Sequence, residues 1–156
     1  MATVNKQRFC HGNPNFIEVV VAYGLAVKKG DMLQLTAANI ASATLVVNAA
    51  DNDTFFAIAD QEHVALTSDD SKVHKIRCII PDPSCVFRYP LGTACNVLVG
   101  QGLAIAGPQS LDMASTDHVA VAVEKADSAS GMEVDVVFCT PVLWGGASKN
   151  VSYTAP

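Results

Sequence analysis

Charged residues are scarce in this chain. Asp, Glu, Lys and Arg together make up 16% of its 156 residues, against roughly 25% in an average globular protein. The formal net charge is -5, and the basic residues are scattered along the sequence. Nucleic-acid binding normally needs a clustered basic footprint, so we expect no nucleic-acid partner. Because charge covers free surface, its shortage indicates a surface that faces a partner protein, or one covered by neutral polar side chains.

Long apolar runs are missing as well. No stretch approaches the roughly 20 apolar residues that a membrane-spanning helix needs, so we expect no membrane association. The N-terminal segment Met1–Cys10 lacks the continuous apolar core of a secretory signal. We therefore expect the protein to be made and kept in a cytoplasm, and to leave it only as part of something larger.

Patterns that carry catalysis or bind metals are also absent. The five cysteines show no CxxC spacing, which excludes zinc-ribbon and thioredoxin-type motifs. Four of them lie among apolar neighbours, where we expect free cysteine to be a small buried hydrophobe. There is no GxSxG elbow, P-loop or GxGxxG motif. Cys10 and His11 offer two ligands where a zinc site needs three or four. The acidic cluster Asp60–His63 follows an expected strand, where polar loop residues are ordinary. We expect no catalytic residues, no metal site and no cofactor.

The most informative pattern that is present is a repeated phrase. Valine, two residues, glycine, two residues and leucine occur at Val27–Leu33 and again at Val97–Leu103. In each copy a β-rich run meets the glycine and an alternating apolar strand follows. Glycine supplies the positive φ that tight turns need, so both copies predict β-hairpins. The repeat suggests an old duplication, although the similar segments Phe56–Ala59 and Val119–Ala122 lie at different distances from the glycines.

Strand patterns dominate the rest of the chain. Lys72–Ile80 alternates, and its even-numbered, more apolar face is predicted to point inward. Met132–Phe138 alternates apolar and acidic residues, which predicts a half-exposed strand with Val134 and Val136 inside. Further strands are expected at Glu18–Tyr23, Phe55–Ala59, Val86–Tyr89 and His118–Glu124.

The expected fold class is all-β: a compact antiparallel β-sandwich or barrel with extended N- and C-terminal arms. Short strands separated by turn residues, at a spacing of roughly 8–12 residues, favour this architecture. Residues 1–16 are polar and aperiodic and form the expected N-terminal arm, residues 17–143 the β domain, and residues 144–156 the C-terminal arm. A short helix is expected at 37–42 or near 110–115.

The two phrases resemble those of the small decoration, or cement, proteins that tailed bacteriophages add to the outside of their heads. In these families a hairpin of the form apolar-x-Lys-Gly-Asp-x-apolar recurs, here Val27–Leu33. A late segment of the type Asp-x-Val-Ala-Val-Ala-x-Glu is also common, here Asp117–Glu124, and Phe56–Ala59 is its earlier counterpart. The resemblance covers residues 19–138. The chain departs from the simplest members through its longer arms and its polar insert at 60–72.

The resemblance implies an all-β domain that forms a homotrimer and is seated where capsomers meet. Its partner would be the major capsid protein, and its location the capsid exterior of the virion after synthesis in the host cytoplasm. Its role would be to clamp neighbouring capsid subunits and stabilise the expanded head. Aromatic side chains dominate interface energetics, so the expected contacts with capsid or neighbouring subunits are Phe9, Phe16, Trp144 and Tyr153 in the arms.

Two other functions stay open at this stage. A carbohydrate-binding or adhesion module on a virion or cell surface would need an exposed aromatic platform, but aromatics make up 6% of the chain and Trp144 is its single tryptophan. A trimeric β-fold hydrolase, with active sites between subunits, would leave few traces in the sequence. The low charge, the apolar excess and the lack of a catalytic cluster favour the structural role.

Overall fold

A computed structural model of the chain describes residues 3–36, 39–67, 72–93, 96–124 and 132–138. The fold is all-β, as the sequence predicts, and helical structure in these residues is limited to one 3-10 turn at Ala49–Asp51. The strands are β1 (Phe9–His11), β2 (Asn15–Val21), β3 (Met32–Thr36), β4 (Asn39–Leu45), β5 (Phe55–Ala59), β6 (His74–Ile80), β7 (Val86–Pro90), β8 (Gly102–Gly107), β9 (Ser110–Asp112), β10 (Ala120–Ala122) and β11 (Glu133–Phe138).

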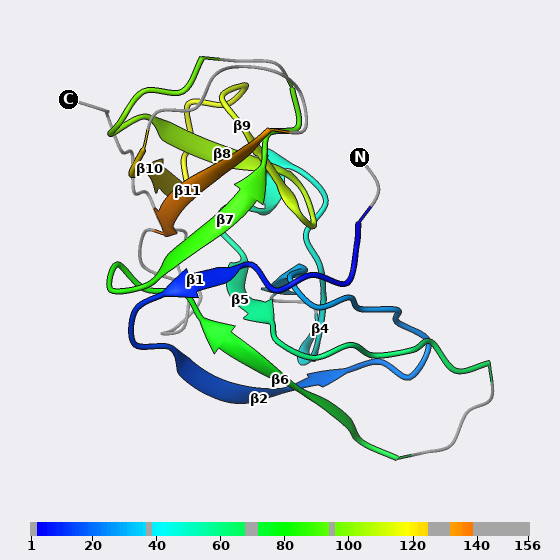
Figure 1. The fold of residues 1–156 in the computed structure, drawn as a ribbon. Coiled ribbons are helices and arrows are strands. Elements are labelled where there is room, and N and C mark those ends of the chain that lie inside the picture. The colour runs from blue at the N-terminus through cyan, green and yellow to red at the C-terminus, as the bar shows by residue number, and fades with distance from the viewer. Residues whose placement is uncertain (1–2, 37–38, 68–71, 94–95, 125–131, 139–156) are drawn as a thin grey trace.

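Five strands of the first half close into a barrel, in the order β2-β4-β3-β5-β6. They occupy the lower part of Figure 1. Neighbouring strands run antiparallel except β2 and β4, which run parallel and meet at Val21 and Ala43. The prediction of an antiparallel sheet is therefore wrong for this pair. A closed ring with an odd number of strands cannot alternate direction all the way round, so one parallel pair is required.

The second half forms a sheet in the order β1-β7-β11-β10-β8-β9, in the upper part of Figure 1. All its strand pairs are antiparallel. The sheet also curls, because β7 and β9 approach each other at a parallel bridge between Leu91 and Leu111. There the Gly92 N–H donates to the Leu111 carbonyl at 2.9 Å.

The two halves repeat one strand order and one register. Strands β2 to β6, the first unit, pair with one another as β7 to β11, the second unit, do. The parallel bridge between Val21 and Ala43 in the first unit has its counterpart in the bridge between Leu91 and Leu111. The chain therefore contains one five-stranded unit twice, and β1 is an addition to the second.

The glycine turns make the same hydrogen bonds in both units. The Gly30 N–H donates to the Ala59 carbonyl at 2.7 Å, and the Gly100 N–H donates to the Ala122 carbonyl at 2.8 Å. In return each alanine N–H donates to the carbonyl of the residue after the glycine, at 2.8 and 2.9 Å. The two tetrapeptides that end at these alanines are therefore structural counterparts, as the sequence predicts.

Loop length explains why these counterparts align poorly in the sequence. The offset between equivalent residues is 70 at the two glycine turns, 68 between Ala43 and Leu111 of the parallel bridges, and 63 at the two alanines. The connections on either side of β9 are thus shorter than their counterparts in the first unit. Loops tolerate such changes because they lie outside the strand ladders.

The side chains inside the two units correspond position by position. The core of the first unit consists of Val19, Val21, Val27, Leu33, Ala43, Phe56, Ala57, Ala59, Ile76 and Cys78. Their counterparts in the second unit, in the same order, are Tyr89, Leu91, Val97, Leu103, Leu111, Val119, Ala120, Ala122, Val134 and Val136, all of which are buried. The predicted inward positions of Val134 and Val136 are confirmed.

The second core is larger because it also receives the outer face of the barrel. Met32, Phe55 and Ile58 of the first unit belong to this larger cluster, and the Phe55 ring lies 5.2 Å from that of Phe138. Ile79, on the face of β6 predicted to point outward, is buried in the same contact. Alternation indicates which face of a strand its own unit buries, so it could not predict that the second unit buries Ile79.

The glycine phrases form turns, as predicted, but the hairpin prediction is wrong. In both copies a hydrogen bond of 3.0 Å closes the turn, and φ is +97° at Gly30 and +85° at Gly100. The segments on either side of the first turn both pair with residues 57–63 and not with each other. Hairpin turns of types I′ and II′ need a positive φ at the first central residue, which is Lys29 here and Val99 in the second copy. A side chain disfavours that conformation.

The N-terminal residues differ from the predicted arm. They are extended but lie on the folded domain: Lys6 contacts the first glycine turn, β1 pairs with β7 of the second unit, and the Arg8 side chain is only 4% exposed. The predicted boundary between residues 16 and 17 falls inside β2, which begins at Asn15. Their sequence lacks periodicity because these residues are held mainly by polar contacts and do not bury a continuous apolar face. The predicted C-terminal arm, residues 144–156, lies outside the described residues.

Neither expected helix forms. Residues 39–45 are strand β4 and residues 110–112 are strand β9. Both segments pair with the strand that precedes them in the chain, β3 or β8. Alanine by itself favours helix, but strand formation depends on the neighbouring strand, and the edge beside these segments decides the conformation.

Alanine at the two glycine turns tests both the turns and the packing over the first one. Gly30→Ala and Gly100→Ala each force a side chain into a positive φ, a strain of about 1–3 kcal/mol. At Gly30 the new Cβ would also lie 2.5 Å from the Lys6 carbonyl oxygen and 2.7 Å from Arg8 Cγ. We expect Gly30→Ala to lower the free energy of unfolding, measured in urea, more than Gly100→Ala does. Equal losses would contradict the packing of Lys6 and Arg8 over this turn.

Candidate functional site

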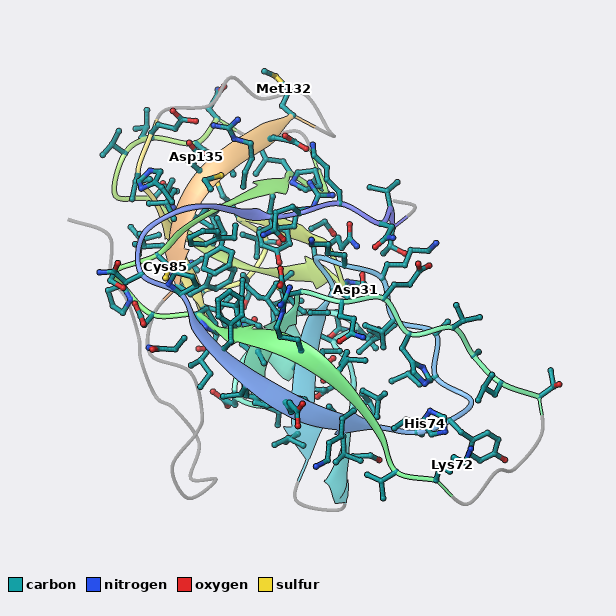
Figure 2. All side chains as sticks on the ribbon, turned by 60° about the horizontal axis from the view of Figure 1, so that its bottom comes forward. Asp31, Lys72, His74, Cys85, Met132 and Asp135 are labelled. Atoms are coloured by element: carbon teal, nitrogen blue, oxygen red, sulfur yellow. The ribbon has the colours of Figure 1, made fainter. Side chains whose placement is uncertain are left out.

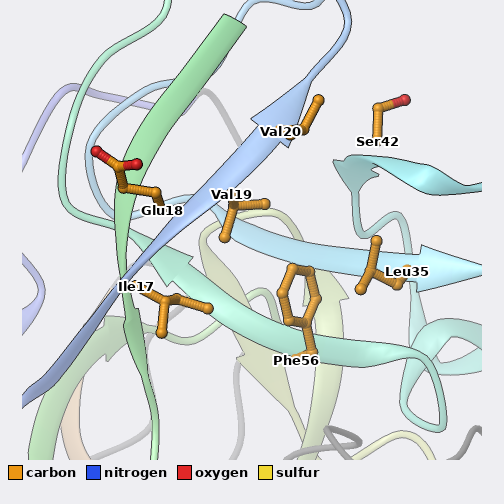
Figure 3. A pocket seen from close by; sticks show the side chains of 7 residues that line it. All are labelled: Ile17, Glu18, Val19, Val20, Leu35, Ser42 and Phe56. Atoms are coloured by element: carbon orange, nitrogen blue, oxygen red, sulfur yellow. The ribbon is translucent and has the colours of Figure 1, made fainter. Parts of the chain in front are cut away.

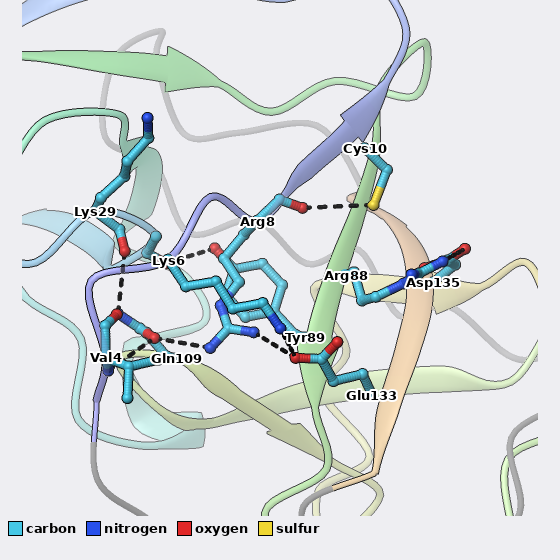
Figure 4. A network of polar contacts seen from close by, with 11 residues as sticks. Val4, Lys6, Arg8, Cys10, Lys29, Arg88, Tyr89, Gln109, Glu133 and Asp135 are labelled. Atoms are coloured by element: carbon cyan, nitrogen blue, oxygen red, sulfur yellow. Dashed lines mark hydrogen bonds and ion pairs between the residues drawn. The ribbon is translucent and has the colours of Figure 1, made fainter.

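A buried polar junction lies beneath the N-terminal segment (Figure 4), with Arg8 at its centre. Arg8 Nη2 donates to Gln109 Oε1 at 2.9 Å and Nη1 donates to Glu133 Oε1 at 3.0 Å. The guanidinium carbon lies 5.6 Å from the centre of the Tyr89 ring. A planar guanidinium can make directed hydrogen bonds and stack on an aromatic face at once. One side chain therefore ties the N-terminal segment to the second unit.

Gln109 extends this junction to the first unit. Its Nε2 donates to Asp31 Oδ1 at 2.7 Å and to the Val4 carbonyl at 2.8 Å. Asp31 Oδ2 accepts the Lys28 N–H at 2.8 Å, inside the first glycine turn. Burial raises the pKa of Asp31, and the hydrogen bonds from Lys28 and Gln109 oppose that shift. The junction thus joins both units and the N-terminal segment through one chain of contacts.

Tyr89 also belongs to the junction and links it to the first glycine turn and to the apolar core. Its hydroxyl donates to the Gly30 carbonyl at 2.7 Å, and its ring packs at 5.9 Å from Phe138. Burial raises the pKa of Tyr89 well above its usual value, so the hydroxyl stays a neutral donor. Most polar groups of the junction pair with one another, so its contacts serve to hold the segments of the fold together.

Two acidic residues of β11 carry ion pairs at the edge of the junction. Glu133 also accepts Lys6 Nζ. Partial burial raises the pKa of Glu133, but Lys6 and Arg8 outweigh it and the net shift is downward. Hydrogen bonds from Arg88, at 2.6 and 2.9 Å, lower the pKa of Asp135. Both pairs therefore add stability at neutral pH, and this contribution is lost as the pH falls through the lowered pKa values.

The acidic cluster noted in the sequence does not assemble into one site. Asp60 is buried and accepts Arg77 Nε at 2.8 Å. His63 points elsewhere: its Nδ1 lies 2.5 Å from the Leu25 carbonyl oxygen and its Nε2 lies 3.3 Å from His74 Nδ1. Within the part of the chain that the structure describes, no group of three or more His, Cys, Asp or Glu residues is placed to hold a metal ion.

The cysteines follow the prediction in part. Cys78 and Cys85 are buried free thiols, and burial raises the pKa of Cys78 to about 12. Cys10, in the N-terminal segment, is exposed. Its strand, β1, pairs on one side only and lies at the end of its sheet.

The predicted aromatic contacts have different surroundings. Phe9 lies in β1 and packs edge-on against Phe87, with 5.8 Å between the ring centres, so it belongs to the fold and does not reach outward. Phe16 lies in β2, is 51% exposed, and has the Arg77 guanidinium 5.1 Å from its ring centre. Trp144 and Tyr153 lie outside the described residues.

An exposed apolar turn is a candidate contact surface that sequence reasoning missed. Leu98 is 58% exposed and Val99 is 68% exposed. The equivalent residues of the first turn are Lys28 and Lys29, and the N-terminal segment covers that turn, since the Lys6 N–H donates to the Lys29 carbonyl at 3.0 Å. Adjacent apolar side chains in a tight turn of a charge-poor chain are the signal that could have identified it.

An opening in the barrel wall is the second feature that sequence reasoning missed. Strand β2 pairs with β6 along its whole length, but among the described residues its other edge has one pairing with β4, at Val21. Where β2 and β4 diverge, the wall opens into a pocket of about 180 Å³, here called the β2 slot (Figure 3). It is lined by Ile17, Glu18, Val19, Val20, Leu35, Ser42 and Phe56.

The polar junction lies apart from the start of β6 and from the residue just before β11. Figure 2 shows Asp31 of the junction near the middle. His74 and Met132, which occupy equivalent positions at the start of β6 and just before β11, lie at opposite ends. The repeated units therefore present corresponding features at opposite ends of the molecule.

Comparisons with known proteins identify no family. No protein-family model matches the sequence, and no curated protein matches it significantly. No helix among the described residues is long and apolar enough to cross a membrane.

Removal of the Arg8 side chain tests the junction. Arg8→Ala leaves Gln109 and Glu133 without their central donor, and a hydrogen bond to a charged group contributes about 1.5–3 kcal/mol. We expect a loss near the lower limit, because Glu133 keeps its pair with Lys6. Arg88→Ala is the matched control, since it breaks the exposed pair with Asp135, and surface pairs contribute little. Urea denaturation would measure both, and equal losses would rule out a central role for Arg8.

Proposed function

We propose that this protein is a structural virion protein of a tailed bacteriophage. It binds the capsid exterior as a homotrimer and stabilises the mature head by clamping neighbouring copies of the major capsid protein. It is made in the host cytoplasm and acts without catalysis, cofactor, nucleic acid or membrane. The observation that carries the proposal is the doubled glycine-turn motif, which resembles that of phage decoration proteins and organises both units of this chain.

The rigidity of the doubled unit supports a clamping role. Each glycine turn holds its alanine strand through two backbone hydrogen bonds, and each unit has its own buried core. The Arg8 junction then fixes one unit against the other. A rigid body loses little conformational entropy when it binds, so more of the contact energy is available to hold two capsid subunits together.

The exposed apolar turn at Leu98 and Val99 is the proposed contact with the capsid. Leu98 and Val99 together offer two aliphatic side chains, and burial of each would contribute about 1.5–3 kcal/mol. Phe16 adds an exposed aromatic side chain on β2. The predicted contacts through Trp144 and Tyr153 remain part of the proposal for the C-terminal residues.

Stabilisation of the shell follows from mass action. A protein that binds the mature lattice and not the immature or broken one shifts the equilibrium toward the mature lattice. A trimer presents each contact three times, so the second and third contacts form at a high effective concentration. Modest apolar contacts can then give firm attachment.

Substitution of the apolar turn tests the contact. In the double variant Leu98→Ser and Val99→Ser the loss of apolar burial should weaken binding to heads that lack the protein by tenfold or more. The measurement is the number of copies bound per head over a series of protein concentrations. The matched control is the double variant Val47→Ser and Val64→Ser, which removes two valines of similar exposure, 64% and 68%.

The outcomes separate the contact from the function. The control should bind as wild type does, and all three proteins should unfold at the same urea concentration. Equal binding by the two double variants would show that the second turn is not the contact. If wild-type protein neither bound the heads nor raised their melting temperature, the capsid role itself would be wrong.

A further inference from the structure

The edge of β2 that faces β4 carries hydrogen-bonding groups directed toward the β2 slot. On the other side of β2, the backbone of Arg77 in β6 is directed at β5 and the residues after it. Its N–H donates to Gln61 Oε1 at 3.0 Å, and its carbonyl accepts the Asp60 N–H at 2.9 Å. Glu18 lies opposite Arg77, so the two form a pair without hydrogen bonds between their backbones. The N–H and the carbonyl of Glu18 therefore point away from β6 and toward the slot.

The second unit shows what kind of segment pairs with such an edge. Arg88 of β7 is the counterpart of Glu18, because each lies opposite the equivalent residue of the neighbouring strand. The Arg88 N–H donates to the Arg8 carbonyl at 2.8 Å, and β1 pairs with β7 from there. In the first unit, no strand of the described chain takes the position that β1 takes in the second. The edge of β2 therefore has the geometry to receive an extended segment.

The slot fits an apolar side chain carried by such a segment. In the second unit Phe9 of β1 packs against Phe87, and the counterpart of Phe87 is Ile17, which lines the slot. Figure 3 shows the side chains of Ile17, Leu35 and Phe56 between β2, β3 and β5. The slot volume of about 180 Å³ is below the roughly 300–1,000 Å³ of typical small-molecule sites. When a strand adds to a sheet edge, backbone hydrogen bonds supply affinity and a side-chain pocket supplies specificity.

We propose that an extended segment of the major capsid protein adds to this edge of β2 as a strand and inserts an apolar side chain into the β2 slot. The identity of this partner rests on the function proposed above. Each of the eleven described strands already pairs within its own copy, so the described part of a second copy has no unpaired strand to contribute. A clamp also needs a contact for each of two capsid subunits. The β2 edge lies in the first unit and the exposed apolar turn lies in the second, so together they supply such a pair.

Amide hydrogen exchange tests the edge without any substitution. The full-length protein is compared free in dilute solution and bound to heads that lack it, with the Glu18 amide resolved by fragmentation mass spectrometry. We expect this amide to exchange quickly in the free protein and at least about tenfold more slowly on the heads, because the capsid segment then accepts its hydrogen bond. The Val19 amide, which alternation directs toward β6, should exchange slowly in both. A slow Glu18 amide in the free protein would overturn the proposal, because the protein itself would then cover the edge.

Proline substitutions separate the edge from the rest of β2. Glu18→Pro removes the N–H directed toward the slot and no hydrogen bond to β6, and proline is tolerated at such an edge. It should weaken binding to heads tenfold or more. The matched control is Val20→Pro, because the second unit carries Pro90 at the equivalent position of β7 and still pairs with β1. Val20→Pro, and Glu18→Ala, which keeps the N–H and removes the carboxylate, should bind as wild type does.

The outcomes distinguish this edge from the capsid function itself. Urea denaturation first establishes that the two proline variants are folded. Equal binding of these variants to heads, or a Glu18 amide that still exchanges quickly on heads, would overturn strand addition while the capsid function stands. If wild-type protein did not bind heads at all, the capsid protein would be excluded as the partner of both the β2 edge and the apolar turn.

Discussion

The hydrogen bonds between each glycine turn and its alanine strand are the constraint on which the rest of the structure depends. The Gly30 N–H reaches the Ala59 carbonyl and the Gly100 N–H reaches the Ala122 carbonyl in the same geometry. Because side chains alternate along a strand, a slip of one residue would turn the whole inner face outward. These contacts set the register of β3 against β5 and of β8 against β10, and the matching cores of the two units follow from that register.

The N-terminal segment makes the two equivalent units different. It covers the first glycine turn, pairs with the edge of β7, and places Arg8 in the polar junction. The second turn and the edge of β2 receive no such cover from it. Two nitrogens of the buried Arg8 guanidinium have hydrogen-bond partners, whereas its Nε has none in the described part of the chain. Loss of Gln109 or Glu133 would leave more of this buried charge unpaired, so these contacts hold the segment in place. The exposed apolar turn at Leu98 and Val99, and the β2 slot, are the surfaces that this asymmetry leaves for other contacts.

Prediction from the sequence succeeded where one strand face decides the conformation. The inward valines of β11, the buried strand β5 and the glycines with positive φ all follow from alternation or from local sterics. It failed where a second unit or a neighbouring strand decides. Ile79 is buried by the other unit, the 39–45 and 110–112 segments become strands because an open edge lies beside them, and Phe9 packs inside the fold. The candidate contact surfaces needed both units, since neither the exposure of Leu98 nor the opening beside Ile17 has a local cause.

The sequence by itself determined the all-β class and the two turns, because these depend on the backbone freedom of glycine and on the alternation of side chains. Only the tertiary structure decided that the turns interrupt a strand and do not form hairpins, that the barrel closes through a parallel pair, and that the N-terminal residues are part of the fold. Those outcomes depend on which distant strand offers free hydrogen-bonding groups, and a pattern read over neighbouring residues does not contain that information.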